Sequence, residues 1–434
     1  MRVLLVNPPI YDFAAYDYWL KPYGLLKVAG AIRHAAELKL FDYLDREHPL
    51  SLAAEPRRDA WNRGTFLSEK IEKPEQFASI PRHYHRFGLP RSLFREYLQR
   101  EGPFDAVLIQ TVMTYWYPGV REVLKDLKQY CPSAKTILGG VYATLCSAHA
   151  QSLGVDLVVK GSELQPLWQF LEVEPQIQAL PFWEGYPTQK TGVLKLSQGC
   201  PFRCSYCSVP LVDPRFYRHS QEKSLMELDW LLQRGVTDVA FYDDALLYQP
   251  ERILIRFLKE VLQRGYRVNF HTPNALNARF ITEELADLLI EAGFKTFHLG
   301  FESSAYEWHR HTDRKVYSHE LVRAVERLVS AGAKRQNITA YLILGHPQSE
   351  LQDVEASIHF ARDTGIRSML AEFSPIPGTP DGEACRKWVN LDEPLWHNKT
   401  VFPIIRLGWE EVQRLKGIAH LANRNIMQES LVSI

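Results

Sequence analysis

Two long runs of alternating strand and helix patterns constrain the fold of this chain more than any other feature. The first run ends near residue 160, and the second extends from the segment before Cys200 to residue 373. Helices between successive strands are typical of parallel sheets, because the chain must cross back before it can add a parallel strand. A length of 434 residues also exceeds what one hydrophobic core supports. The sequence therefore predicts an α/β protein with at least two domains.

The first run predicts a Rossmann-like parallel sheet in a domain that spans residues 1–172. The predicted strands are 3–6, 38–44, 106–110, 135–138 and 156–160, and the predicted helices are 25–36, 118–130 and 143–153. Residues 45–100 are rich in Arg, His, Pro and Glu and have weak periodicity, so we interpret them as an insertion into this domain.

The second run predicts a partial (β/α)6 barrel of the TIM type over residues 188–384. A strand leads into Cys200, and the further predicted strands are 238–241, 268–271, 296–300, 338–344 and 368–373. Helices are predicted at 220–234, 250–264, 282–292, 318–331 and 351–364. Chemistry in such barrels lies at the carboxyl ends of the strands. Residues 385–434 are predicted to form a short helical C-terminal extension that packs on the barrel.

Composition and charge exclude several classes of protein. The 51 basic and 51 acidic side chains cancel, so bulk electrostatics gives no reason to expect a nucleic-acid partner. The first apolar run is too short for a signal peptide, and no run approaches the roughly 18 residues of a membrane span. Six cysteines in so long a chain do not make a disulfide framework. We therefore expect a cytoplasmic protein without a membrane span.

Three of the six cysteines lie close together, at Cys200, Cys204 and Cys207. Structural zinc sites draw cysteines in two pairs, and no second pair exists here. Three thiolates can hold a [4Fe-4S] cluster in which one iron has no protein ligand and can bind a substrate or cofactor. A zinc site completed by His219 or another residue is the alternative.

The pattern Cys-x3-Cys-x-aromatic-Cys, with Tyr206 as the aromatic residue, resembles the signature of the radical S-adenosylmethionine (SAM) superfamily. This resemblance implies a [4Fe-4S] cluster whose open iron binds SAM, and a one-electron cleavage of SAM that yields a 5′-deoxyadenosyl radical. It also implies a reductant such as flavodoxin or ferredoxin. In such enzymes the cofactor carries the difficult chemistry, and the protein orients it and excludes water.

Residues at the other strand ends agree with this resemblance. The family often has Gly-Gly-Glu after the second barrel strand to bind the methionine amino group, and this chain has Asp243 and Asp244, between which the choice stays open. The further positions that the resemblance assigns to SAM are Tyr206, Glu302, Ser303, Gly345 and Pro375. Simple turn chemistry is the alternative for each of them, because Gly and Pro end strands in many proteins.

The third strand end carries four polar side chains, which are His271, Asn274, Asn277 and Arg279. Contact with an unknown substrate is one interpretation. A loop in which Asn side chains bond to their own backbone is the other, and it is equally compatible with the sequence. No residue can be assigned a catalytic role from the sequence.

The order of motifs in residues 1–172 resembles the cobalamin-binding-like domain that precedes the radical SAM barrel in one large subgroup. Candidate cobalamin contacts are Thr111, Tyr115, Gly139 and Gly140. Corrinoid proteins of this fold supply a histidine from an Asp-x-His-x-x-Gly loop after the first strand, and here the loop from Asn7 to Phe13 has no His. Many enzymes of the subgroup hold cobalamin without such a histidine, so cobalamin stays a possible cofactor.

The resemblance implies cobalamin-dependent methyl transfer to an unactivated carbon or phosphorus centre. The first alternative is a radical SAM enzyme with non-methylating chemistry, namely an oxidation, rearrangement or ring closure, whose first domain has lost cobalamin. The second alternative is a non-catalytic iron–sulfur or zinc sensor module. A sensor has no need of the carboxylates and glycines at the other strand ends.

Overall fold

The computed structural model describes residues 1–312 and 316–432, and the chain divides into two compact units that we describe separately. Unit 1 consists of Met1–Gly192, Asp229–Gly235 and Asn390–Asn398. Unit 2 consists of Val193–Leu228, Val236–Val389 and the segment from Lys399 to the end of the described chain. The last two residues of the predicted C-terminal extension lie outside the described residues.

Unit 1 is built on a five-stranded parallel sheet in the order β10-β9-β8-β1-β4. Its strands are β1 (Arg2–Asn7), β4 (Glu37–Asp42), β8 (Ala106–Gln110), β9 (Lys135–Gly139) and β10 (Leu157–Val158). All the predicted strands are present, with ends that agree or differ by at most a few residues. The Rossmann-like parallel sheet is therefore confirmed.

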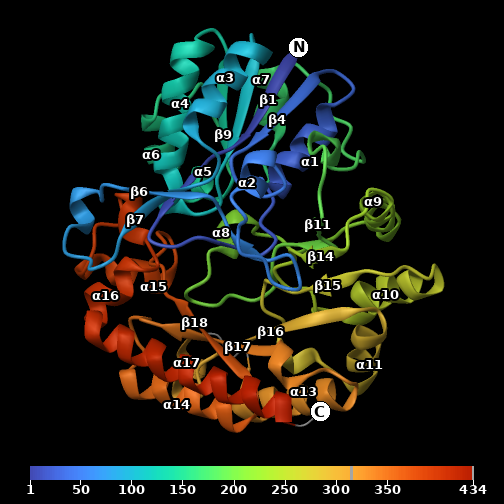
Figure 1. Cartoon of the computed structure of the whole chain (residues 1–434), viewed down its shortest axis with the longest axis vertical. Coiled ribbons are helices and arrows are strands. Elements are labelled where there is room, and N and C mark those ends of the chain that lie inside the picture. The colour runs from blue at the N-terminus through green and yellow to red at the C-terminus, as the bar shows by residue number, and fades with distance from the viewer. Residues whose placement is uncertain (313–315, 433–434) are drawn as a thin grey trace. The chain divides into compact units, whose positions relative to one another are not determined.

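Helices cover both faces of this sheet. They are α1 (Tyr23–Ile32), α3 (Arg91–Glu101), α4 (Tyr117–Tyr130), α5 (Val141–Leu145), α6 (Ser147–Ser152) and α7 (Gln165–Leu171). The chain moves from β1 to β4 in one direction and from β4 through β8 to β10 in the other, so right-handed crossovers place α1 on one face and α3 and α4 on the opposite face. Figure 1 shows this division of the helices.

Residues 45–100 contain more regular structure than their weak periodicity predicts. They form α2 (Pro49–Ala53), β5 (Gly64–Thr65), β6 (Ser68–Ile71), β7 (Tyr84–Phe87) and α3. Two small antiparallel sheets pair these strands with β2 (Ile10–Asp12) and β3 (Tyr16–Asp17). Helix α3 is the crossover between β4 and β8, so its residues belong to the main alternation.

One predicted helix is divided in the structure. The pattern predicts a continuous helix over 143–153, whereas the chain leaves the helical conformation at Cys146 (φ −123°, ψ 44°). The hydroxyl of Tyr142 lies 2.6 Å from Nδ1 of His149, and both rings pack on Tyr117. These tertiary contacts outweigh the helical preference of the segment.

Residues 390–398 belong to unit 1 and form hydrogen bonds with its N-terminal part. The Tyr117 hydroxyl donates to Glu393 at 2.9 Å, and Asn398 donates to the buried carboxylate of Asp12 at 2.9 Å. This segment includes η8 (Pro394–His397). Part of the predicted C-terminal extension thus belongs to the fold of the first unit.

Unit 2 carries a six-stranded sheet in the order β11-β14-β15-β16-β17-β18. The strands are β11 (Thr191–Leu194), β14 (Asp238–Phe241), β15 (Asn269–His271), β16 (Phe294–Glu302), β17 (Ile338–Leu344) and β18 (Arg367–Glu372). Neighbouring strands from β14 to β18 are parallel. The sheet follows the chain order, as a partial (β/α)6 barrel requires, which confirms this expectation.

The longer helices that accompany this sheet follow the strands in the predicted order, and the end of the first of them, from Asp229, belongs to unit 1. They are α9 (Gln221–Gln233), α10 (Leu254–Gln263), α11 (Glu283–Glu291), α13 (Ser318–Ser330), α14 (Leu351–Asp363) and α17 (Trp409–Val432). Shorter helices lie in the loops, namely α8 (Val209–Val212), α12 (Tyr306–Thr312), α15 (Pro380–Glu383) and α16 (Val401–Leu407). In Figure 1 helices α11, α13 and α14 lie along one side of the strands.

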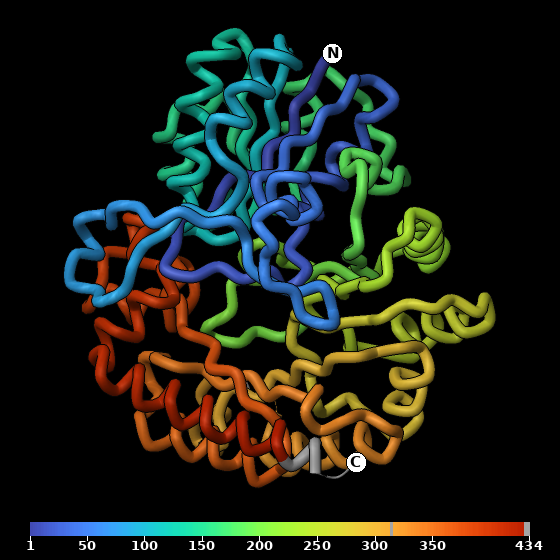
Figure 2. Tube along the Cα trace, in the orientation of Figure 1, coloured from blue at the N-terminus to red at the C-terminus, as the bar shows by residue number. Residues whose placement is uncertain are grey.

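Helix α17 packs beside α14 and β18, and Figure 2 shows this C-terminal segment in red along the orange one. The side-chain amide of Asn423 donates to the main-chain oxygen of Ser368 and accepts from its amide, both at 2.8 Å. The expectation that the tail packs on the barrel is therefore confirmed.

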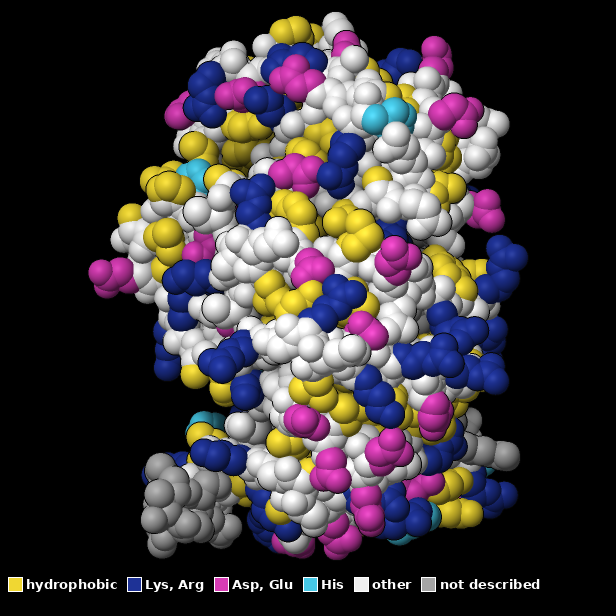
Figure 3. All heavy atoms as spheres, turned by 90° about the vertical axis from the view of Figure 1, so that its right-hand side faces the viewer, with side chains coloured by type: hydrophobic (Ala, Val, Ile, Leu, Met, Phe, Trp, Pro, Cys, Tyr) yellow, Lys and Arg dark blue, Asp and Glu magenta, His cyan; other side chains and the backbone are white. Residues whose placement is uncertain are grey.

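Basic, acidic and apolar side chains are interspersed on the face of the molecule that Figure 3 shows. Within residues 1–312 and 316–432, none of the helices combines the length and the apolar character that crossing a bilayer requires.

Candidate functional site

A short hairpin closes the loop that carries the three clustered cysteines. Strand β12 (Ser197–Gln198) pairs antiparallel with β13 (Tyr217–Arg218), and Cys200, Cys204 and Cys207 lie between them. Each cysteine is partly buried. Gly199 has a φ of +74°, and a Cβ there would lie 2.5 Å from the carbonyl oxygen of Arg215. Only glycine lets the loop begin in this way.

The donor set of this loop fits a cluster better than a single metal ion. In the part of the chain that the structure describes, no three His, Cys, Asp or Glu side chains are placed to hold one metal ion. A zinc ion needs all its ligands around one centre, whereas a cubane distributes its thiolates over separate irons. Nδ1 of His219 lies 2.8 Å from the carbonyl oxygen of Lys195, a contact that fixes the orientation of the ring. The three cysteines of this loop therefore suit a cluster better than a zinc ion.

The two aspartates after β14 have different surroundings. The carboxylate of Asp243 is buried and accepts hydrogen bonds from the amide of Leu196 and from the amide and hydroxyl of Ser197. Burial raises its pKa to about 6. Asp244 is less buried and forms an ion pair with Lys195, whose Nζ is 3.5 Å away. Burial raises the pKa of Asp244 as well, against the opposing effect of Lys195 and the amide of Gly199.

Strand β16 ends in a strained residue. Glu302 has a φ of +68°, and the register between β16 and β17 shifts between Gly300 and Glu302. Left-handed conformations of residues other than glycine are costly, and they concentrate at functional sites. Glu302 and the next residue, Ser303, are both buried. The oxygen of the Ser303 main chain lies 2.6 Å from Nε2 of His309 on α12.

Two rings pack on Tyr206, the residue before the third cysteine of the loop. The ring of Tyr206 stacks on Trp308, with centroids 5.9 Å apart, and meets His346 edge-on at 6.1 Å. Gly345 ends β17 with a φ of +89°, and a Cβ there would lie 2.7 Å from Cβ of Pro403. Pro375, which follows β18, is buried.

The structure also joins residues that the sequence analysis did not assign to the site. Ser205 donates its hydroxyl hydrogen to Asp381 at 2.6 Å, and Nε2 of His346 lies 2.9 Å from the same carboxylate oxygen. Asp381 follows the Pro-Gly-Thr-Pro turn after β18, and His346 follows Gly345. Each of these two residues is next to a motif that the sequence analysis identified. The contact between Ser205 and Asp381 spans 176 residues, however, so no local sequence pattern indicates it.

The four polar residues after β15 are not equally available to a ligand. His271 is fully buried, with Nε2 2.9 Å from Asp238 and Nδ1 3.1 Å from the hydroxyl of Thr296. The amide of Asn274 donates to the main-chain oxygens of residues 242 and 243, at 3.1 and 3.2 Å.

Asn277 and Arg279 differ from these two. Nδ2 of Asn277 is buried and has no hydrogen-bond partner among the described residues. The Arg279 guanidinium is exposed and lies over the ring of Phe202, 5.7 Å from its centroid. Phe202 belongs to the cysteine loop, so Arg279 is beside that loop.

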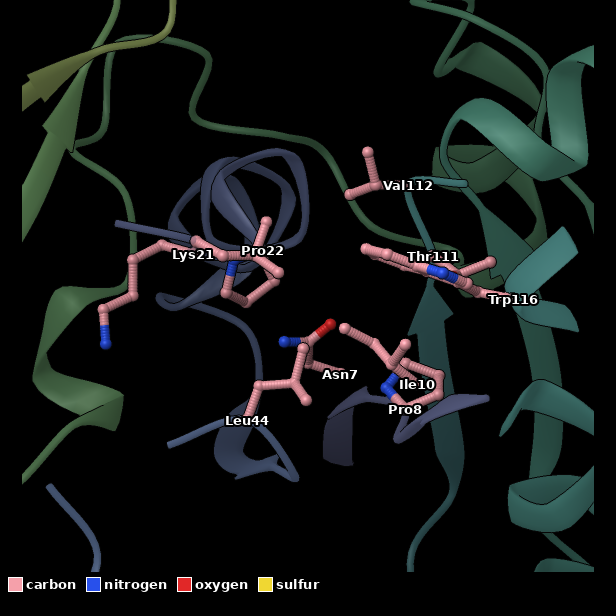
Figure 4. A pocket seen from close by; sticks show the side chains of 10 residues that line it. Asn7, Pro8, Ile10, Lys21, Pro22, Leu44, Thr111, Val112 and Trp116 are labelled. Atoms are coloured by element: carbon pink, nitrogen blue, oxygen red, sulfur yellow. The ribbon is translucent and has the colours of Figure 1, made fainter. Parts of the chain in front are cut away.

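In unit 1 a small pocket lies at the carboxyl ends of β1 and β8. These strands flank the point where the strand order reverses, which is where open α/β sheets bind their ligands. Figure 4 shows Asn7, Thr111 and Trp116 around this space, whereas the ammonium end of Lys21 points away from it. The enclosed volume is about 10 Å³, which is room for about one water molecule.

The four candidate cobalamin residues lie at or near the same sheet edge. Thr111 lines the pocket, and Tyr115 is almost completely buried. Gly140 has a φ of +90°, and a Cβ there would lie 2.7 Å from Gln110 and 2.8 Å from the oxygen of Thr111. A Cβ at Gly139 would meet only Val159, at 3.9 Å, so the backbone there is open to approach.

Comparison with protein families gives one match in unit 2 and the adjoining segments. Residues 194–361, which begin at the end of β11 and include the cysteine loop, match the Radical SAM superfamily. The match covers the strands from β14 to β17 and the helices between them.

Two of the relatives in sequence carry the name methyltransferase. An uncharacterised methyltransferase of Pyrococcus horikoshii is 28% identical over 193 residues, which is 43% of this chain and 40% of that protein. A second one, of Synechocystis sp., is 24% identical over 286 residues, or 59% of this chain and 52% of that protein. The chain thus spans about half the length of these relatives.

Similar solved structures cover nearly the whole chain. TsrM, a radical SAM methyltransferase of Kitasatospora setae solved with cobalamin and a [4Fe-4S] cluster, is 15% identical with a TM-score of 0.67, covering 96% of this chain and 90% of that one. OxsB, solved with aqua-cobalamin and SAM, is 14% identical with a TM-score of 0.58, covering 96% of this chain and 60% of that one. At these identities the likeness is one of fold.

Proposed function

Because residues 194–361 form a radical SAM domain, we propose that this protein is a radical SAM enzyme that catalyses cobalamin-dependent methyl transfer to an unactivated carbon or phosphorus centre. The observation that carries the proposal is the closed loop with Cys200, Cys204 and Cys207 at the carboxyl end of the first barrel strand. When bound there, a [4Fe-4S] cluster and SAM supply a 5′-deoxyadenosyl radical after one-electron reduction by a donor such as flavodoxin or ferredoxin.

The residues around the loop suit the binding of SAM. We assign the methionine amino group to Asp244 rather than Asp243, because the oxygens of Asp243 already accept hydrogen bonds from Leu196 and Ser197. Tyr206 and the turn at Gly345 offer an aromatic and main-chain surface for the adenine. We also assign Glu302, Ser303 and Pro375 to the SAM site. They lie at the ends of β16 and β18.

The substrate side of the site is assigned to residues after β15. Asn277 supports this assignment best, because a buried amide donor with no protein partner is costly unless a ligand satisfies it. Arg279, beside the cysteine loop, is the second candidate. The side chains of His271 and Asn274 form hydrogen bonds with other groups of the protein. We therefore propose that they stabilise the site and do not contact the substrate.

The proposal assigns cobalamin binding to the carboxyl ends of the strands in unit 1. The reversal of strand order and the open backbone at Gly139 favour a ligand at this edge. The volume of about 10 Å³ means that side chains such as Val112 and Trp116 must move before a corrin or its nucleotide tail can enter. That closure favours a second candidate function, a radical SAM enzyme of non-methylating chemistry without cobalamin.

Anaerobic reconstitution with iron, sulfide and hydroxocobalamin tests both candidates. We expect four irons and one cobalt per chain, and release of 5′-deoxyadenosine when SAM and a reductant are added. Replacing any of Cys200, Cys204 or Cys207 by Ala should abolish the release, whereas Cys131→Ala and Cys146→Ala should not.

Four irons without cobalt would select the non-methylating candidate. A Cys204→Ala protein that still released 5′-deoxyadenosine would contradict the assignment of the cluster to this loop. If cobalt is retained, a deuterated SAM methyl group recovered in a product would establish methyl transfer.

A further inference from the structure

Ser205 lies between the second and third clustered cysteines, and hydrogen bonds hold all of its polar groups. Its amide donates to the main-chain oxygen of Thr312 at 3.1 Å, and its hydroxyl donates to Asp381 at 2.6 Å. Its own carbonyl oxygen accepts from the amide of Asp381 at 3.2 Å. The loop is thus attached at this point to the end of α12 and to the segment after β18.

Asp381 is itself held in place by His346. The side chain of Asp381 is buried, and Oδ2 accepts from both Ser205 and Nε2 of His346. Nδ1 of His346 accepts from the amide of Gln348 at 3.2 Å, so the ring hydrogen of the neutral form must lie on Nε2, toward Asp381. Burial opposes ionisation of Asp381, but its bonds with His346 and Ser205 outweigh burial and lower its pKa.

Trp308 connects this pair with the next residue of the loop. Its indole Nε1 donates to Nδ1 of His346 at 3.3 Å, and its ring stacks on Tyr206. The segments that follow β16, β17 and β18 therefore all meet at residues 205 and 206. Each of these segments also carries a residue that we assign to SAM.

We propose that Asp381 and His346 are positioning residues that hold the cluster loop through Ser205, so that Cys204 and Cys207 keep the spacing that the cluster needs. The inference rests on the proposed function. Groups that orient the ligands of a metal centre have large effects on its affinity for the metal. A ligand that must first become ordered when the metal binds lowers this affinity. A buried carboxylate with two donors also has one defined position, which makes it a rigid support for the loop.

Three variants of the full-length protein test this proposal. Ser205→Ala removes one hydroxyl, Asp381→Asn removes the charge, and His346→Leu removes both ring contacts. After anaerobic reconstitution, we expect iron to be lost to a chelator about 10-fold faster than from the wild type. We also expect a changed electron paramagnetic resonance spectrum of the reduced cluster.

Two further variants separate positioning from a general loss of stability. His346→Gln keeps an N–H donor toward Asp381. It should therefore lose iron at a rate close to that of the wild type. Ser224→Ala removes a buried hydroxyl that donates to the main-chain oxygen of Ser220, just before α9, and should behave as the wild type. Ser205→Ala is the mildest change, and its fold can be checked by circular dichroism.

The outcomes distinguish this inference from the function on which it rests. If the wild type binds four irons and all three variants lose iron at the wild-type rate with an unchanged spectrum, the positioning role is wrong and the proposed function stands. If the wild type binds no iron after reconstitution, the proposed function is wrong, and this inference is wrong with it.

Discussion

The carboxylate of Asp243 accepts two hydrogen bonds from Ser197, one from its main-chain amide and one from its hydroxyl, each 2.6 Å long. Ser197 begins the short strand that closes the cysteine loop, and Asp243 follows β14. A carboxylate with this many donors has little capacity left for a ligand. Asp243 thus anchors the loop at its base.

Asp243 should make the stability of the protein depend on pH. Burial raises its pKa from 3.8 to about 6, so folding favours its protonated form. This contribution is fully present below pH 3.8 and is lost as the pH rises through about 6. Between pH 5 and pH 7.5 we expect a loss of about 1.4 kcal/mol, relative to a variant that does not titrate.

The comparison variant is Asp243→Asn, and thermal unfolding of both proteins without iron gives the measurement. As the pH rises from 5 to 7.5, the melting temperature of the wild type should fall relative to that of Asp243→Asn. A difference that stays constant across this range would contradict a pKa of about 6 for Asp243 in the folded protein.

Gly345→Ala should destabilise unit 2 through two effects. A Cβ there would lie 2.7 Å from Pro403, and the residue has a φ of +89°. Left-handed strain and overpacking together should cost about 3 kcal/mol. Gly265 has a φ of +67° with nothing within 4 Å of an added Cβ, so Gly265→Ala isolates the strain and should cost about 1 kcal/mol. Equal urea midpoints for the two variants would contradict the packing part of this prediction.

Gly140→Ala should weaken cobalamin binding. An added Cβ would displace Gln110 and the oxygen of Thr111 at the sheet edge. The side-chain oxygen of Gln110 accepts from the amide of Leu25 at 2.6 Å, so the start of α1 would also shift. We expect about 10-fold weaker retention of hydroxocobalamin, measured by its absorbance after gel filtration, which corresponds to about 1.4 kcal/mol.

The matched control for this position is Gly154→Ala. Gly154 also has a positive φ, +80°, but an added Cβ would meet no atom within 4 Å. Its cobalamin retention should equal that of the wild type. Equal losses in both variants would point to a general effect of strain on unit 1 rather than to the edge at Gly140.

Asn423→Ala should loosen the C-terminal helix. It removes two hydrogen bonds to the main chain of Ser368 and leaves that amide and carbonyl without these partners, at a cost of about 2 kcal/mol. Urea unfolding measures the loss. His420, on the same helix but exposed, provides the control, since His420→Ala should change the midpoint little. A wild-type midpoint for Asn423→Ala would show that α17 is held by packing alone.

The strands were the most predictable part of this fold. The ranges 106–110, 238–241 and 338–344 agree with the observed strands to the residue. Each is an apolar run between polar or turn residues, so local sequence determines both ends. Residues 45–100 were harder, because their short strands pair with β2 and β3 and depend on contacts with distant segments.

The candidate site shows the same division. The cysteine spacing lies within eight residues, so the sequence alone could indicate a cluster. Different environments for Asp243 and Asp244 could not be inferred, because they depend on which carboxylate faces Ser197. The contact between Ser205 and Asp381 likewise exists only once β11 and β18 have taken their places in one sheet. Polar networks of this kind join positions with no shared periodicity.

The contact between Asn423 and Ser368 has a consequence for the assembly of the chain. Strand β18 is the last strand of its sheet, and the amide and carbonyl of Ser368 are groups that a further strand would use. The side-chain amide of Asn423 takes up both, as a peptide group of an added strand would. Open sheet edges recruit strands from other molecules. Helix α17 therefore occupies both groups of Ser368 at this edge, and we expect a chain cut before this helix to aggregate through β18.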